Sequence, residues 1–313
     1  MLVLYVVWGS TYLGIAVAVD SIPPFVMAAS RFLLAGLILL AWSVARDRRA
    51  FVMPNRRQVR DSAIVGALLV AGGNGFVAFA EQTLPSGITA LLIATMPIWV
   101  AILGGFFLGE RLPRVAALGV AVGFVGVAVL AAPSILGGNG ALEPIGLLFA
   151  LMAPLAWASG SLFASHRADL PPRPLVATGM QMVFGGILLS VLALGTGEVA
   201  TFDIGGVTRD SVIAFLYLTV IGSLLAYTVY GFMLRVAPLP LVTTYAYVNP
   251  VVAVILGAIV LGEPIDLRTI VAGTIIVAAV ALIVTARGRM AAPRAVRAVS
   301  PASGADVADA ATA

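Results

Sequence analysis

The side chains that could carry chemistry in this chain are few, and most of them lie inside long apolar stretches. Charged residues make up 10% of the 313 residues, against about 25% in a typical soluble domain. A polar group inside lipid is costly unless it has a partner or faces water, so each one is a candidate for a solute path. The polar groups within apolar stretches are therefore the first place to look for a binding site.

Arg31 is the most telling of these groups because a guanidinium stays charged at physiological pH. It lies within an apolar run, where an Arg near mid-bilayer costs about 2.5 to 3.5 kcal/mol on the insertion scale. We expect one of three partners: a carboxylate of the solute, the carboxylate of Glu81, or water reached by snorkelling. Gln181 takes the corresponding position in the second half of the chain, so a charge is expected at this site in one half only.

Glu81 is the candidate proton site. No acidic residue lies in the middle of an apolar run, and Glu81 stands at the end of one. If it is desolvated, its pKa rises and it can exchange a proton with the outside. A solvated carboxylate at the end of a helix is the alternative.

Aromatic, amide and hydroxyl side chains supply the rest of a candidate cavity. Rings can stack on flat solutes or bind cations through their faces. An aromatic belt at the lipid–water interface is the alternative for the rings, and it is the interpretation favoured for Tyr230. For Asn74 the alternative is an interhelical hydrogen bond of about 0.6 to 2 kcal/mol. The sequence predicts these substrate-binding residues: Trp8, Thr11, Tyr12, Arg31, Asn74, Gln82, Thr95, Trp99, Trp157, Gln181, Tyr227, Thr243, Tyr247 and Asn249.

Pro97 and Pro250 lie within apolar runs. A proline in a helix interior removes one backbone hydrogen bond and frees a carbonyl group, so both helices are expected to kink near the midplane. The freed carbonyl could serve a gate or a ligand. An ordinary kink, with the carbonyl satisfied by a neighbouring Thr, is the alternative.

The composition argues against an enzyme and against a metal site. The chain has no Cys, which excludes disulfides and thiolate sites, and its single histidine is His166. A membrane enzyme acting on lipid-linked phosphates would need clustered Asp, His or Lys residues, and the sequence contains no such cluster. We therefore expect no catalytic residue, no cofactor and no metal.

Long apolar helices must carry these side chains. Hydrophobic residues make up 61% of the chain, and apolar runs of about 20 residues are long enough to span about 30 Å of hydrocarbon. The expected fold class is an all-α integral membrane protein with ten transmembrane helices. They are predicted at about 2–19, 24–45, 62–80, 86–108, 113–131, 144–165, 174–195, 211–234, 240–261 and 267–286.

The Arg distribution predicts that both termini are cytoplasmic. All 18 basic residues are Arg. With the N-terminus inside, 15 of them fall in cytoplasmic segments and 2, Arg209 and Arg268, in outer loops, as the positive-inside rule requires. The cytoplasmic set is Arg46, Arg48, Arg49, Arg56, Arg57, Arg60, Arg111, Arg114, Arg167, Arg173, Arg235, Arg287, Arg289, Arg294 and Arg297.

One segment is repeated 153 residues later in the chain. Leu84 to Arg111 and Ala237 to Pro264, aligned without a gap, share 8 of 28 residues, including both prolines above and a Leu-Gly-Glu ending. An odd number of spans in each half makes the repeats inverted, so Glu110 is expected to face the cytoplasm and Glu263 the outside. Both acids are expected to bind backbone donors at a helix N-terminus. The expected organisation is a first five-helix repeat at 1–132, an outer connecting loop at 133–143, a second five-helix repeat at 144–286 and a disordered cytoplasmic tail at 287–313.

The start of the chain allows a different interpretation. Residues 1–19 could be a signal peptide that ends at Ala16-Val17-Ala18, but no basic residue precedes the run and polar groups interrupt it. The sixth helix also has several more residues before Trp157 than the first helix has before Trp8. The sequence is therefore expected to begin inside the first helix, with further residues before Met1.

Several short motifs, in this order and at these spacings, resemble the EamA-type transporters of the drug/metabolite transporter superfamily. The resemblance covers about residues 1–286. It implies a bacterial inner-membrane exporter of small metabolites or drugs, with a central cavity lined mainly by helices 1, 3, 4, 6, 8 and 9. The motifs are Trp8-Gly9-Ser10-Thr11-Tyr12, Arg31-Phe32, Leu84-Pro85-Ser86-Gly87, Met96-Pro97 and the two Leu-Gly-Glu helix ends.

The leading hypothesis is a secondary transporter that exports small metabolites or drug-like solutes, amino-acid-like ones above all, by alternating access around the central cavity. A lipid flippase or scramblase is the alternative, since it too needs only a polar groove. The expected partners are a small-molecule substrate and the lipid bilayer of the cell inner membrane, with no nucleic acid. A monomer is sufficient for this function.

Overall fold

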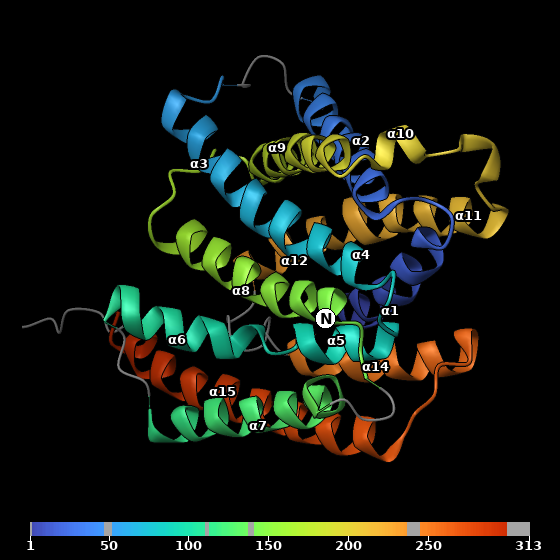
Figure 1. Cartoon of the computed structure of the whole chain (residues 1–313). Coiled ribbons are helices and arrows are strands. Elements are labelled where there is room, and N and C mark those ends of the chain that lie inside the picture. The colour runs from blue at the N-terminus through green and yellow to red at the C-terminus, as the bar shows by residue number, and fades with distance from the viewer. Residues whose placement is uncertain (1, 47–51, 110–112, 137–140, 237–244, 299–313) are drawn as a thin grey trace, which may run out of the picture.

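Every regular element of the described residues is a helix, as the computed structural model in Figure 1 shows. The structure describes residues 2–46, 52–109, 113–136, 141–236 and 245–298. Over these ranges the chain forms helices and turns and no strand. The all-α class expected from the apolar runs is confirmed for this part of the chain.

Nine helical segments of the described residues are long and apolar enough to cross a membrane. They agree with nine of the predicted spans to within a few residues at most ends. The other predicted span, at about 240–261, begins outside the described residues, and its described part contains a shorter apolar helix, Val248–Leu261. The count of ten therefore stays a prediction.

The helices are named here in chain order. In the first half they are α1 (Leu2–Val19), α2 (Pro24–Arg46), α3 (Arg56–Gly66), the π-helical segment η1 (Ala67–Gly75), α4 (Phe76–Ala80), α5 (Ser86–Ile93), α6 (Met96–Leu108) and α7 (Arg114–Leu136). In the second half they are α8 (Pro144–His166), α9 (Pro174–Gly195), α10 (Glu198–Thr201), the 3₁₀ turn η2 (Ile204–Gly206), α11 (Arg209–Tyr217), the π-helical segment η3 (Leu218–Leu225), α12 (Ala226–Val236), α14 (Tyr245–Leu261) and α15 (Leu267–Ala298).

Two helix ends differ from the prediction because polar residues continue the helix beyond its apolar run. α3 begins at Arg56 and not near 62, since Asn55 and Gln58 form a reciprocal capping box in which each side chain accepts the other's backbone N–H. α15 runs past 286 to Ala298, through Ala- and Arg-rich sequence that favours helix. The rest of the tail predicted to be disordered, 299–313, lies outside the described residues.

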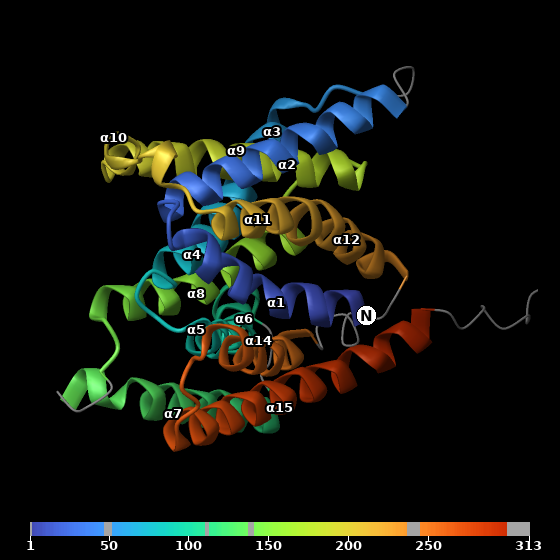
Figure 2. The same cartoon turned by 90° about the vertical axis from the view of Figure 1, so that its right-hand side faces the viewer.

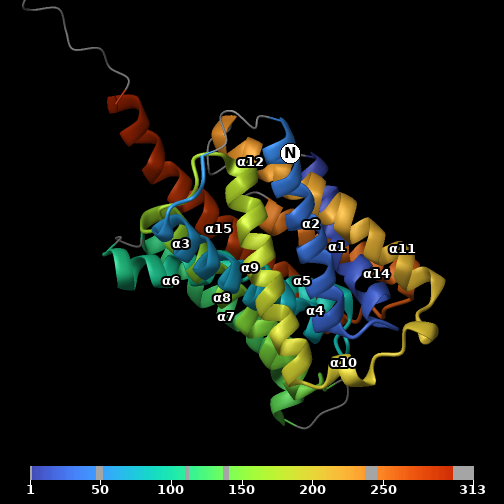
Figure 3. The same ribbon diagram turned by 90° about the horizontal axis from the view of Figure 1, so that it is seen from above.

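The helices pack in pairs that join one half of the chain to the other. α2 lies along α9 at one end of the bundle, and α7 lies along α15 at the opposite end (Figures 1 and 2). Seen from above, α2 and α9 run side by side across the bundle (Figure 3). Between these pairs, α1 packs against α14 and α6 against α8. The centre of the molecule is therefore built from both halves.

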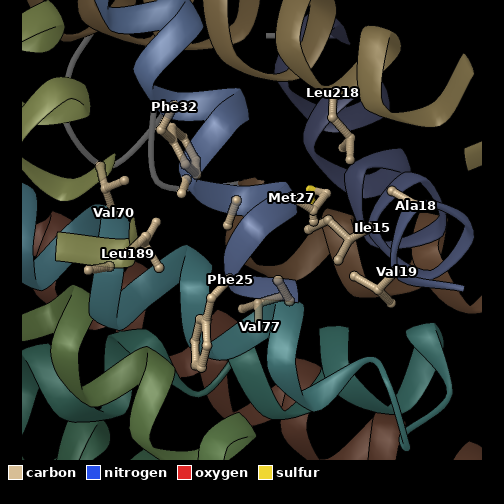
Figure 4. Close-up of a cluster of buried hydrophobic side chains, with 14 of the residues drawn as sticks. Ile15, Ala18, Val19, Phe25, Met27, Phe32, Val70, Val77, Leu189 and Leu218 are labelled. Carbon is tan, nitrogen blue, oxygen red and sulfur yellow. The ribbon is translucent and has the colours of Figure 1, made fainter. Parts of the chain in front are cut away.

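A buried apolar cluster holds α2 against the second half (Figure 4). Phe32 and Met27 of α2 are fully buried, as are Leu189 of α9 and Leu218 of η3. Because burying a large apolar side chain contributes about 1.5 to 3 kcal/mol, this cluster fixes the depth and rotation of α2. The residue before Phe32 is Arg31, so the same packing fixes the position of its guanidinium.

The outer faces of the helices expose large apolar side chains. Phe106 of α6 is 81% exposed and Ile259 of α14 is 76% exposed, and Leu37, Leu118 and Val191 are more than half exposed. A soluble protein seldom leaves so much apolar surface open to water. These faces fit lipid, and the nine apolar helices together mark the chain as a multi-pass membrane protein.

Candidate functional site

A cavity of about 90 Å³ lies where the two halves of the chain meet. Its walls come from α1, α2, η1, α4, α5 and α6 of the first half and from α8, α12 and α14 of the second. This volume can hold a few water molecules or the polar part of a small solute. The predicted site residues that line it are Trp8, Thr11, Tyr12, Arg31, Asn74, Trp157, Tyr227, Asn249 and Pro250.

Trp8 is the centre of an aromatic cluster on one wall of this cavity. Its ring centroid lies 6.5 Å from that of Trp157, 5.7 Å from Tyr227, 5.0 Å from Tyr230 and 4.9 Å from Tyr245. The contacts with Trp157, Tyr227 and Tyr245 are edge-on, an arrangement that aromatic rings prefer. Trp8 comes from α1 and the other four rings come from the second half, so the cluster joins the halves.

Gly73 allows Trp157 to lie against η1. A Cβ added at Gly73 would stand 2.6 Å from the Trp157 ring, closer than side chains approach. Any larger residue at this position would push the ring out of place. The Gly72-Gly73 pair therefore sets the width of the cavity between η1 and α8.

Asn74 and Tyr227 form a hydrogen bond across the two halves. The Asn74 Nδ2 donates to Tyr227 Oη at 3.1 Å and to the carbonyl oxygen of Leu69 at 3.0 Å. The two residues are 153 positions apart, which is also the spacing of the repeated segment. Asn74 thus lines the cavity and also makes the interhelical bond that was its alternative role.

Arg31 is buried and faces the cavity. Its residue exposure is 3%, and its Nε donates to the buried Ser223 Oγ at 2.8 Å. A Cβ added at Gly222 would come within 3.2 Å of Nη2, so glycine at this position leaves room for the guanidinium. The Arg31 Cζ also lies 4.7 Å from the centroid of the Phe32 ring, which provides a cation–π contact.

Two of the partners expected for Arg31 are not found in the described part of the chain. Its burial excludes snorkelling to the surface. The ion pairs among the described residues join Arg60 to Asp61 and Arg268 to Asp266, and neither Glu81 nor another described carboxylate pairs with Arg31. A guanidinium has five N–H donors, so most of its donors remain available to a ligand in the cavity.

Two further cavity residues, Thr11 and Asn249, are positioned by hydrogen bonds to the backbone. Thr11 Oγ1 donates to the carbonyl oxygen of Trp8 at 2.6 Å. The amide of Asn249, in the orientation that satisfies both its groups, donates to the carbonyl oxygens of Tyr245 at 3.2 Å and Tyr5 at 3.3 Å. Asn249 thereby ties α14 to α1 at the cavity wall.

Several predicted site residues do not line the cavity. Gln82 is exposed in the turn after α4, and Thr95 Oγ1 donates to the Leu92 carbonyl oxygen in the break between α5 and α6. Trp99 packs edge-on against Phe124 of α7, at a centroid distance of 5.8 Å. Gln181 lies on α9, and its backbone carbonyl oxygen faces Gly66 of α3. Thr243 and the side chain of Tyr247 lie outside the described residues.

The two prolines behave differently. The helix that contains Pro97 is interrupted, because α5 ends at Ile93 and α6 begins at Met96. Pro97 then occupies the first turn of α6, where its missing N–H is not needed. Pro250 lies inside α14, and it also lines the cavity. A role of either proline in gating stays a prediction.

Glu263 binds the start of α5, as expected for a helix-end acid. Its Oε1 accepts from the backbone N–H of Ser86 at 2.7 Å and its Oε2 accepts from that of Gly87 at 3.0 Å. The carboxylate satisfies two orphan donors and complements the positive end of the helix dipole. Its twin Glu110 lies outside the described residues.

Replacing Glu263 by Ala should destabilise the protein by about 1 to 3 kcal/mol, because two N–H groups at the start of α5 lose their acceptor. The unfolding temperature in detergent measures this loss. Asp20→Ala is the control, since Asp20 is exposed after α1. An unchanged unfolding temperature for Glu263→Ala would show that water replaces the cap.

Three polar or aromatic residues at the site were not predicted from the sequence. Tyr245 lines the cavity and meets the Trp8 ring, and Ser223 holds Arg31. Tyr230 was assigned to an interfacial belt, but its ring packs against Trp8 and Tyr245. One signal could have found Tyr245, because it stands four residues before Asn249 and so shares its helix face.

Membrane-spanning helices from two halves around a cavity with polar and aromatic walls define a multi-pass membrane transporter. The EamA-like transporter family matches residues 1–132 and 144–285, so the chain belongs to that family. Its relatives include the uncharacterized inner membrane transporter YedA of Escherichia coli, 37% identical over 90% of this chain and 88% of the relative. The protein is thus an inner-membrane transporter, and the resemblance noted from its motifs is confirmed.

Two other comparisons were informative, one in sequence and one in fold alone. A probable amino-acid metabolite efflux pump of Salmonella typhimurium is 28% identical over 84% of this chain and 86% of its own length. One crystal structure aligns over 96% of this chain and 97% of the other chain, with a TM-score of 0.62 and 19% identity. This likeness shows a shared fold.

Proposed function

We propose that the protein exports small amino-acid-like solutes by alternating access around the cavity between its two halves. The observation that carries this proposal is the cavity itself, which both halves line and which contains the Arg31 guanidinium without a carboxylate partner among the described residues. A solute bound there touches both halves at once. Rocking one half against the other would then expose it to one side of the membrane at a time.

Pairwise contacts between equivalent parts of the chain support two inverted halves, and the Arg distribution supports cytoplasmic termini. α2 packs on α9 and α7 on α15, which are the second and fifth helices of each half. The π-helical segments η1 and η3 lie in the third helix of each half, and Asn74 meets Tyr227 at the repeat spacing. A pseudo-two-fold axis in the membrane plane would bring such equivalents together.

The chemistry of the cavity favours a solute with a carboxylate and an apolar or cationic part. Arg31 can bind a carboxylate by paired hydrogen bonds, and the aromatic cluster around Trp8 can take an ammonium group or an apolar side chain. An amino acid carries all of these groups. The name of the Salmonella relative, an amino-acid metabolite efflux pump, supports the same class.

A proteoliposome screen tests the proposed solute class. Vesicles that contain the purified protein are loaded in turn with labelled amino acids, a sugar and a cationic dye, and efflux is followed against empty vesicles. We expect saturable efflux of one or more amino acids and none of the sugar. Efflux of every solute at the rate of empty vesicles would refute the proposal, and efflux of the dye alone would refute the carboxylate class.

Lipid flipping, the alternative from the sequence, gains no support from the relatives, which are named as transporters and efflux pumps. Transport also accounts for the site without a chemical reaction, in keeping with a family of transporters.

A further inference from the structure

Glu81 is a buried carboxyl group without a hydrogen-bond partner. It lies in the turn between α4 and α5, it is 5% exposed, and neither of its oxygens meets a donor in the described part of the chain. Its neighbours Ala80 and Leu84 are buried in the apolar cluster that also contains Trp8. Glu81 is therefore enclosed, and it is not the solvated helix end that was the alternative from the sequence.

The groups that face Glu81 bring no positive charge to it. Tyr12 of α1, which lines the cavity, and Glu263 after α14 are the described ionisable groups that interact with it electrostatically, and the backbone of Ala16 on α1 adds a smaller interaction of opposite effect. On α8, Glu143 accepts from the backbone of its own first turn. On α2, Arg31 donates to Ser223 of η3. No cation neutralises Glu81 in this conformation among the described residues.

Two hydroxyl groups near this turn are also unsatisfied. Ser86 Oγ and Thr89 Oγ1, in the first turns of α5, are buried and have no partner among the described residues. Ser86 also provides one of the backbone N–H groups that Glu263 binds. The junction of α4, α5 and α14 thus contains several buried oxygens, and neither of these hydroxyl groups is placed to donate to Glu81.

The neutral form of Glu81 is far less costly here than the charged form. An ionised carboxylate would lose several kcal/mol of hydration with no charge to replace it. A neutral acid group without partners costs about 1 to 3 kcal/mol. Burial first, and the negative charge of Glu263 second, therefore raise the pKa of Glu81 well above its usual range.

We propose that Glu81 carries a proton in this conformation, which is closed around it, and that this proton is exchanged for the solute: Glu81 takes it up from the periplasm when the α4–α5 end of the cavity opens and releases it when the cavity opens to the cytoplasm. On uptake the carboxylate electron pair forms an O–H bond with a proton from periplasmic water. On release that bond breaks, the electron pair stays on the carboxylate, and the proton leaves to water on the cytoplasmic side. With the N-terminus in the cytoplasm, the α4–α5 end faces the periplasm. This inference rests on the proposed function, because it names the ion that drives transport through the same cavity.

The direction of the pH effect follows from linkage. The pKa of Glu81 is raised in the closed conformation and ordinary once water reaches it, so between these two values the closed conformation binds the proton and the open one does not. Raising the pH through this window therefore favours opening, and lowering it favours closure.

Infrared spectroscopy of the full chain in lipid nanodiscs tests the protonation state without any solute. At pH 7 we expect the carbonyl-stretch band of a protonated carboxyl group, absent in Glu81→Gln and retained in Asp20→Asn, which changes an exposed carboxylate after α1. A spectrum without this band in the unmodified protein, or a band that persists in Glu81→Gln, would overturn the proposal. Because the unmodified protein supplies the first result, a variant that fails to fold does not block the test.

Transport in proteoliposomes tests the coupling. For one proton exchanged per solute, a gradient of about one pH unit, acidic inside, should drive about tenfold accumulation of a labelled amino acid. Glu81→Gln should abolish this accumulation and Asp20→Asn should keep it. Accumulation driven by a sodium gradient, or amino-acid exchange by the unmodified protein that does not depend on pH, would refute proton coupling. Either result would still agree with the proposed export function. If no amino acid moves under any condition, the proposed function fails, and the infrared result alone decides whether Glu81 holds a proton.

Discussion

Replacing Arg31 by Met should raise the KM for a carboxylate-bearing solute about 30-fold or more, because removing a buried charged partner costs about 2 to 5 kcal/mol of binding. The fold itself should not suffer. Arg31 is buried without a carboxylate partner among the described residues, and a flexible apolar side chain in place of a buried charge is often neutral or stabilising. We therefore expect an unchanged or higher unfolding temperature together with lost transport, as measured in detergent and in proteoliposomes.

The matched control is Arg60→Met, which removes the guanidinium paired with Asp61 on α3. That side chain is 66% exposed and does not line the cavity, so its loss should leave KM unchanged. A KM that rises equally in both variants would point to a general effect of charge. Loss of transport in Arg31→Met together with a falling unfolding temperature would assign Arg31 a structural role.

Replacing Trp8 by Ala should have the second large effect, on stability and transport together. Truncating a buried Trp costs about 3 to 5 kcal/mol. The Trp8 side chain is 8% exposed and its ring contacts four other aromatic rings. The same change removes a wall of the cavity, so solute binding should weaken as well. Unfolding temperature and KM report the two effects separately, and Trp8→Phe should recover part of both.

Trp99→Ala is the control for this prediction. It deletes the same side chain, but Trp99 packs against Phe124 outside the cavity. Its loss should reduce stability and leave KM unchanged. If Trp99→Ala raises KM as much as Trp8→Ala does, Trp99 binds solute as its sequence position first suggested, and the cavity between the halves is not the whole site.

The spans were predictable because length and apolarity decide them, and sequence records both. The exceptions arise where polar residues extend a helix. The capping box of Asn55 and Gln58 starts α3 about two turns before its apolar run, and an apolarity criterion cannot see it. The interruption at Ala94 and Thr95 follows from Pro97, but whether a proline bends a helix or splits it depends on packing around the freed carbonyl groups.

The sequence indicated which residue types form the site better than it indicated which way their side chains point. These helices are apolar on nearly every side, so no polar face shows which way an aromatic side chain turns. Trp8 and Trp99 are alike in sequence context, yet only Trp8 faces the cavity. Tyr245, four residues before Asn249 on α14, lines the cavity and was not among the predicted residues.

Whether Glu81 is buried or solvated could not be predicted from its position at the end of an apolar run. Whether such a carboxylate is solvated depends on what covers it, and its cover comes from distant parts of the chain. Ser223, which holds Arg31, lies 192 residues from its partner. Contacts of this kind join the two halves, and no local pattern records them.

Side-specific cysteine labelling tests whether two oppositely oriented halves enclose one cavity. The natural chain has no Cys, so Arg114→Cys and Leu267→Cys each give a single thiol, exposed at the first residue of α7 and of α15 and 153 positions apart. In intact cells a membrane-impermeant maleimide should label position 267 from outside and position 114 only after the membrane is opened. Labelling of both positions from the same side would contradict the inverted halves and the cavity that depends on them.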